Sequence, residues 1–223
     1  GSGSKETIDL AIERYLPYFL LSFFGADFAG GMFQQFWDRV TAAGQAANPF
    51  RAGMVQIVMV GDTDEEARRL YEKPVQYFFQ RCAHIYPGFL EAPGYKSIES
   101  LRAVLPKPGA KSASRPDSFA VAKNYTWDDF VETGIVIGGS PDTVRERLEA
   151  TAKRLNVGNW VTLLHMGNMP KETALHNIDL FTTKVAPGLR NTFPDHQHEW
   201  WPQPIEGFQP ATVSTVARGE ASR

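Results

Sequence analysis

Two short segments of the sequence carry residue types that are suited to binding a small ligand. The first is Gly1-Ser2-Gly3-Ser4, directly before a helix-prone stretch that opens with Lys5. Glycines allow close approach of the backbone, Ser4 can cap the helix, and the N–H groups of a first helical turn favour an anion such as a phosphate. The same four residues are also typical of an expression linker, so both interpretations stay open.

The second segment is His165-Met166-Gly167-Asn168, which follows an apolar, β-prone run that starts at Trp160. Side chains at the carboxyl end of a parallel strand lie where α/β proteins build their binding sites. A histidine there can hydrogen-bond a ligand, although a lone histidine at a strand end is more commonly structural. Ser22, Phe23 and Phe24 end another apolar run and can line a flat apolar pocket.

Other chemistry has little support in the sequence. Cys82 is the only cysteine, which excludes an intrachain disulfide and favours a reducing cytoplasm, and its helical apolar spacing predicts an inert core position. His196 and His198 near Glu199 have a spacing that can bind a metal adventitiously, but no third strong ligand accompanies them and no metal site is predicted. Neither a GxGxxG loop, a Walker loop nor a Ser-His-Asp arrangement is found.

Composition excludes several classes of protein. The 223 residues are 43% hydrophobic and 22% charged, as in an ordinary globular protein with one sizeable core. A net charge of -2 without a local Lys/Arg cluster argues against nucleic acid as a partner. The longest apolar run, residues 15–26, is shorter than the roughly 20 residues that a membrane helix needs.

Apolar, β-prone runs alternate with helical segments, which predicts parallel βαβ units. Buried strands are expected at residues 16–24, 54–60 and 160–165, with a short extended piece at 135–137. Helix starts are expected at Asp27, at Thr63, where a capping box with Glu66 is predicted, and at Pro170. A further start is Ser140 followed by Pro141 at the first helical position.

Apolar spacing also predicts which helical residues are buried. The expected stripes are Phe28, Met32, Phe36 and Val40; Val144, Leu148 and Leu155; and Leu175, Ile178, Phe181 and Val185. Pro74 should kink the helix that contains it. Residues 86–126 lack regular signals and form a long loop of functional or disordered character, and residues 194–223 form an irregular tail.

Several motifs, in order, resemble those of one family. Gly139-Ser140-Pro141-Asp142-Thr143-Val144, then Asn156-Val157-Gly158, then residues 161–164, resemble the C-terminal signature of the luciferase-like monooxygenases. The ending Ile178-Asp179-Leu180-Phe181 followed by residues 184–190 is similar to the last helix of that family. Upstream, residues 21–25, 36–39 and 87–95 resemble one subgroup of its FMN-linked members.

The resemblance implies an α/β fold in which residues 1–193 are the C-terminal part of a (β/α)8 TIM barrel, with the long loop at about 86–126 as an insertion. Three long strands cannot close an eight-stranded barrel, so the barrel is incomplete in this chain. Either an N-terminal half is missing or a partner chain supplies the rest. We therefore expect the chain alone to be inactive, and we expect a homo-oligomer.

The activity that the resemblance implies is that of a flavin-dependent monooxygenase, which uses reduced FMN and O2 to insert oxygen into a small organic substrate. It places Ser2, Gly3, Ser4 and Phe24 at the cofactor, and Ser22, Phe23 and His165 at the substrate; no residue is identified as the catalyst. Two alternatives stay open. One is an F420-dependent oxidoreductase of the same superfamily, and the other is a non-catalytic half-barrel remnant or partner subunit.

Overall fold

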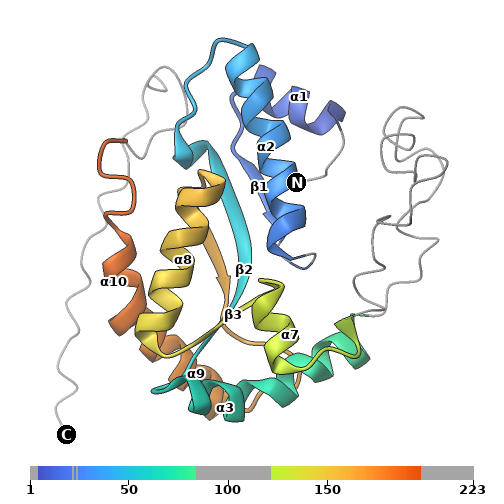
Figure 1. Ribbon diagram of the computed structural model, residues 1–223, viewed down its shortest axis with the longest axis vertical. Coiled ribbons are helices and arrows are strands. Elements are labelled where there is room, and N and C mark those ends of the chain that lie inside the picture. Colours follow the sequence, from blue (N-terminus) through green and yellow to red (C-terminus); the bar gives the residue numbers. More distant parts are fainter. Residues whose placement is uncertain (1–4, 22, 24, 84–121, 197–223) are drawn as a thin grey trace, which may run out of the picture.

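The computed structural model describes residues 5–21, 23, 25–83 and 122–196, and in them a parallel four-stranded sheet is flanked by helices (Figure 1). The strands are β1 (Tyr18–Leu21), β2 (Ala52–Val60), β3 (Val136–Gly139) and β4 (Asn159–Leu163). The helices are α1 (Lys5–Glu13), α2 (Ala26–Ala42), α3 (Asp64–Tyr77), α7 (Trp127–Glu132), α8 (Pro141–Leu155), α9 (Lys171–Leu180) and α10 (Ala186–Leu189). Shorter turns are the 3-10 helix Pro49–Arg51 and the π-helical turns Phe78–Cys82 and Phe181–Val185.

Strand β2 is the centre of the sheet, because the other three strands all pair with it. Val55 pairs with Leu21 of β1 and with Val161 of β4, so β1 and β4 lie on opposite edges of β2. Ile57 likewise pairs with both β3 and β4. Strands β1 and β3 therefore lie one after the other along the same edge of β2, and β4 occupies the other edge.

This strand order decides which face each helix covers. The chain crosses from β1 to β2 in one direction, returns to β3, and crosses back to β4. Because crossovers between parallel strands are right-handed, each reversal sends the connecting helix to the opposite face of the sheet. Helices α2 and α8 accordingly pack on one face, with α8 alongside β2 and β3, whereas α3 and α7 pack on the other (Figure 1).

The expected strands and the parallel βαβ order are thus confirmed, and the short extended piece is β3. Barrel closure is not seen in the described residues, whose sheet is open. Its helices also cover both faces, whereas the helices of a (β/α)8 barrel form one outer ring. None of the described helices is long and apolar enough to cross a membrane.

The face that α3 and α7 cover is only half covered. Ile57 and Met59 of β2 are fully buried beneath these helices. On the same face toward the other end of β2, Leu21 is 45% exposed and Val161 is 46% exposed. Strands of parallel sheets are normally buried on both sides, so these apolar side chains form an incomplete layer.

Several local predictions need correction. Gly25, with φ at +85°, is the N-cap of α2 in place of Asp27, because glycine alone adopts that backbone without strain. Thr63 does cap α3, accepting from the Glu66 N–H, but the Glu66 carboxylate accepts from the N–H of Asp62, not of Thr63. Cys82 is exposed because the π-helical turn that follows the Pro74-containing helix shifts the apolar stripe and buries Phe79.

The apolar stripe predicted for α9 is half wrong. Phe181 and Val185 are buried, but Leu175 and Ile178 are exposed. The residue that α9 turns toward the sheet is polar: Asn177 is fully buried, and its side-chain amide donates to Val58 O and Leu164 O at 2.9 Å and accepts from Val60 N–H at 2.7 Å. Asn177 thus continues the hydrogen-bonding of the β2 edge beyond the last residue of β4.

We expect Asn177→Ala to destabilise the fold by about 3 kcal/mol, because the β2 backbone groups it satisfies would stay buried without a partner. The matched control is Ile178→Ala on the exposed side of the same helix, which should cost less than about 1 kcal/mol. Urea unfolding of the three proteins measures both values. Equal losses for the two variants would contradict the role given to Asn177.

Candidate functional site

The segments that follow β1 and β4 both reach the end of α3 and the π-helical turn Phe78–Cys82 after it. The Phe23 ring, just after β1, lies 5.8 Å from the Phe78 ring and 6.3 Å from the Phe79 ring. Just after β4, Gly167 lies so close to this turn that a Cβ there would stand 2.2 Å from the Pro74 carbonyl oxygen. Gly167 also has φ at +56°, so glycine serves both the contact and the conformation.

The structure describes only two of the seven residues expected at the site. Phe23 is partly buried among the aromatic rings of the core that α3 provides. His165 is exposed, with Nε2 3.3 Å from the carbonyl oxygen of Met169. The other five expected residues, Ser2, Gly3, Ser4, Ser22 and Phe24, lie outside the described residues, as do residues 84–121 of the long loop and 197–223 of the tail.

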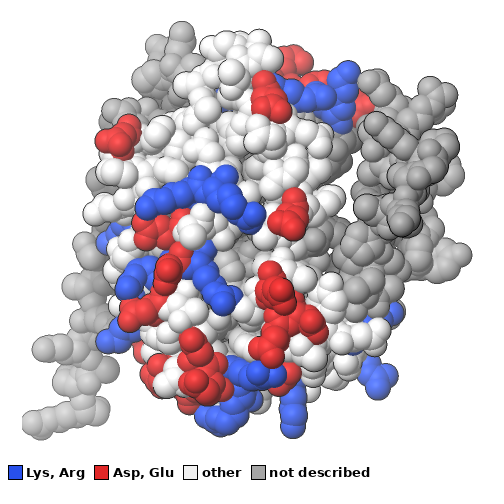
Figure 2. All heavy atoms as spheres, in the orientation of Figure 1, with Lys and Arg blue, Asp and Glu red and all other residues white. Residues whose placement is uncertain are grey.

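A polar pocket of about 250 Å³ opens between the start of α3, α7 and the start of α8. Its charged lining is Asp64, Glu65, Arg68, Asp128 and Arg147. Arg68 pairs with Asp128 at 3.1 Å, so part of this charge is already balanced within the pocket. Figure 2 shows the same balance on this face, where acidic and basic side chains are interspersed over α3, α7 and α8.

Asp64 lines this pocket and accepts hydrogen bonds from the start of α8. Its carboxylate accepts from Ser140 N–H at 2.6 Å and from the Thr143 hydroxyl at 3.3 Å. The hydrogen bond from the Ser140 backbone is the main cause that holds the pKa of Asp64 below its ordinary value of 3.8. The Asp64 carboxylate therefore already supplies the negative charge that the start of α8 favours. This makes the start of α8 a poor site for an external phosphate.

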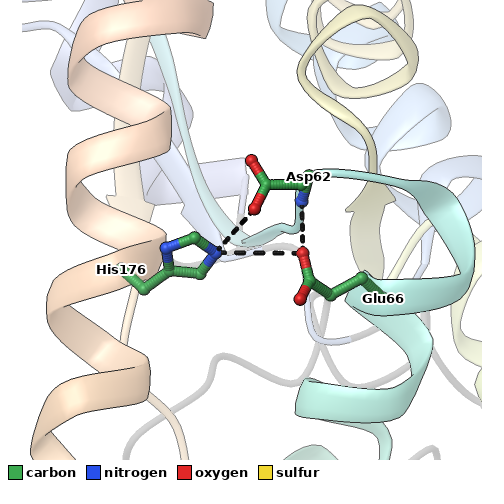
Figure 3. Close-up of side chains that lie close together, drawn as sticks. All are labelled: Asp62, Glu66 and His176. Atoms are coloured by element: carbon green, nitrogen blue, oxygen red, sulfur yellow. Dashed lines mark hydrogen bonds and ion pairs between the residues drawn. The ribbon is translucent and has the colours of Figure 1, made fainter.

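A second polar group lies where the chain leaves β2. Asp62, Glu66 of α3 and His176 of α9 point toward one another (Figure 3). Nε2 of His176 is 3.6 Å from Oδ2 of Asp62 and 4.0 Å from Oε2 of Glu66. The sequence alone does not indicate this group, because His176 is distant in sequence from Asp62 and Glu66 and lies beside them only after α9 docks through Asn177.

Buried polar residues at the sheet were also missed. Gln56 is fully buried, and its amide donates to the carbonyl oxygens of Gly134 and Ile135, which ties β2 to the segment before β3. Arg51, 2% exposed, donates to Gln45 and lies over the rings of Tyr15 and Phe36 at the start of β2. In the sequence, the only sign that Gln56 or Arg51 is buried is that each polar residue stands between apolar neighbours.

Comparison with known proteins gives one family. The model of a family described as luciferase-like monooxygenase matches residues 1–157. A search of curated proteins returned no match.

Solved structures give the same fold. The chain is similar to the oxygenating constituent of 3,6-diketocamphane monooxygenase from Pseudomonas putida, a type II Baeyer-Villiger monooxygenase in complex with FMN, with a TM-score of 0.52 and 23% identity over 84% of this chain. It is also similar to the monooxygenase RslO1 from Streptomyces bottropensis, with a TM-score of 0.52 and 14% identity over 83% of this chain. The chain covers 46% of each of these two proteins.

Asp64→Asn should lower the free energy of unfolding at neutral pH by about 1 kcal/mol, since the charge that matches the start of α8 is lost. The folded-state pKa lies below 3.8, so the carboxylate stabilises the fold above that pH, and this contribution disappears as the pH falls below it. Urea unfolding at neutral and at acid pH should show the two proteins converging in acid. Glu65→Gln is the control, and a difference from wild type that persists in acid would refute the assignment.

Proposed function

The chain belongs to the luciferase-like monooxygenase family, and we propose that it is the C-terminal part of a flavin-dependent monooxygenase. The family match over residues 1–157 carries this proposal. The similarity to a solved FMN complex favours FMN over F420 as the cofactor. Because the chain covers 46% of that protein, the rest of the active site is expected from a further segment or a partner chain.

Bound reduced flavin would supply the reaction with O2 that leads to oxygen insertion into a small organic substrate; the protein supplies binding, orientation and exclusion of water. We propose that the segments after β1 and β4 perform these tasks. Phe23 and Gly167, which lies two residues after His165, contact the same end of α3 and the turn after it, which supports a shared pocket wall. Ser22 is proposed for that wall as well, and Phe24 for the cofactor.

For the flavin phosphate we propose the turn Ser2-Gly3-Ser4 before α1. A glycine allows close approach of the backbone, and the N–H groups of a first helical turn point toward an anion placed there. The start of α8 is the competing position in the described residues, and there Asp64 already accepts from Ser140 N–H. This internal carboxylate supports the assignment of the phosphate to the start of α1.

The half-covered face of the sheet supports the proposal that a further segment or a partner chain packs on it. A closed barrel would also require α3 and α7 to leave this face for the outer ring. Phe19, Leu21, Val55 and Val161 share this face by strand register and are partly or largely exposed. An apolar layer of this kind is normally covered by further strands or helices. We propose that the remaining part of the barrel packs here, and that the flavin ring lies at the carboxyl end of the completed sheet, where barrel enzymes bind their substrates.

The test is oxygenation by two proteins: this chain, and the gene product including any segment that precedes residue 1. With reduced FMN, O2 and a panel of ketones, aldehydes and aromatics, we expect turnover only from the longer protein. FMN absorbance of each purified protein is the accompanying measurement.

Steady turnover by this chain alone would show that no further segment is needed. Flavin binding and turnover absent from the longer protein would instead favour the non-catalytic partner subunit.

A further inference from the structure

The group formed by Asp62, Glu66 and His176 has the composition of a metal site. It offers one imidazole nitrogen and two carboxylate oxygens, and these ligand atoms all lie within 4.8 Å of one another. Zn²⁺ binds such nitrogen and oxygen atoms at about 2.0 to 2.2 Å, which places the ligands of a tetrahedral site roughly 3.4 Å apart. The separations of 3.6 Å and 4.0 Å from the His176 Nε2 exceed this by roughly 0.2 and 0.6 Å, and the two carboxylate oxygens lie within 4.8 Å of each other, so side-chain rotations suffice to close the site.

The three side chains come from elements that the fold holds in place. Oε2 of Glu66 accepts from the Asp62 N–H at 2.8 Å, which fixes the Glu66 carboxylate beside the turn that carries Asp62. Asn177, the next residue after His176, anchors α9 with two hydrogen bonds to the β2 backbone and one to the carbonyl oxygen of Leu164, just after β4. The hydrogen bonds of Asn177 therefore hold His176 of α9 beside the turn that carries Asp62 and Glu66.

Charge around the group favours a cation. Two of its three side chains, Asp62 and Glu66, are carboxylates that lie beside each other at the start of α3. Arg69 pairs with the other oxygen of Glu66, Oε1, at 3.0 Å and leaves Oε2 directed at His176. The Asp62 side chain is 66% exposed and that of His176 is 37% exposed, so an ion can enter from solvent and keep water as a further ligand.

We propose that Asp62, Glu66 and His176 form a binding site for a divalent transition metal of the Zn²⁺ type, with water in the open coordination position. A bound ion would join the turn after β2 and the start of α3 to α9. The proposal does not depend on flavin binding. It concerns a site at the end of β2, separate from the segments assigned to the cofactor and substrate.

The test uses the whole chain freed of metal and titrated with Zn²⁺ in a calorimeter, with Co²⁺ absorption as a second probe of imidazole and carboxylate coordination. We expect one ion per chain. His176→Asn, Glu66→Gln and Asp62→Asn should each weaken Zn²⁺ binding by at least about tenfold. Zn²⁺ should also raise the unfolding temperature of the wild type and not that of His176→Asn.

Two controls separate this site from other histidines and from loss of surface charge. The double variant His196→Asn, His198→Asn removes the histidines of the tail, and Glu65→Gln removes a carboxylate from the same turn of α3. Both should bind Zn²⁺ as the wild type does. Wild-type affinity in His176→Asn, or loss of binding in the tail variant, would overturn the proposal.

Discussion

The rest of the structure depends on the pairing of β2 along both of its edges. One edge carries β1 and then β3, and the other carries β4 and then the side chain of Asn177. Backbone groups in a dry core must be paired, so a strand buried along its whole length requires neighbours along its whole length. Strand β4 ends too early to satisfy the end of β2, and Asn177 supplies the missing hydrogen bonds, which in turn fixes α9 and His176.

The same strand order accounts for the uneven covering of the sheet. Each reversal of direction about β2 sends the next helix to the opposite face, so α3 and α7 shelter Ile57 and Met59 but not Val161. The result is an α/β unit that retains an apolar, half-open area around Leu21 of β1 and Val161 of β4. We propose this area, with the segments that follow those strands, for the flavin ring and the substrate.

Periodicity and capping rules predicted the strands, the α3 and α8 caps and most of the core, because each depends on residues that are near in sequence. The family resemblance was confirmed by the family match, which covers residues 1–157. What the sequence did not reveal depends on contacts between distant segments. Asn177 interrupts an apolar stripe and was passed over, Cys82 is exposed by a π-helical turn, and His176 meets Asp62 only after α9 docks. The flavin and substrate roles proposed for all seven residues, Phe23 and His165 included, remain predictions.

The central claim is that the half-covered sheet face is a contact surface of the complete flavin site. Its most direct test is the FMN dissociation constant of the gene product including any segment that precedes residue 1, measured for Val161→Lys beside Gln35→Lys, which adds the same charge to an exposed position of α2. A buried unpaired charge is costly, so Val161→Lys should weaken FMN binding at least about tenfold while Gln35→Lys leaves it unchanged. Equal FMN affinity in the two variants, both folded, would contradict the claim.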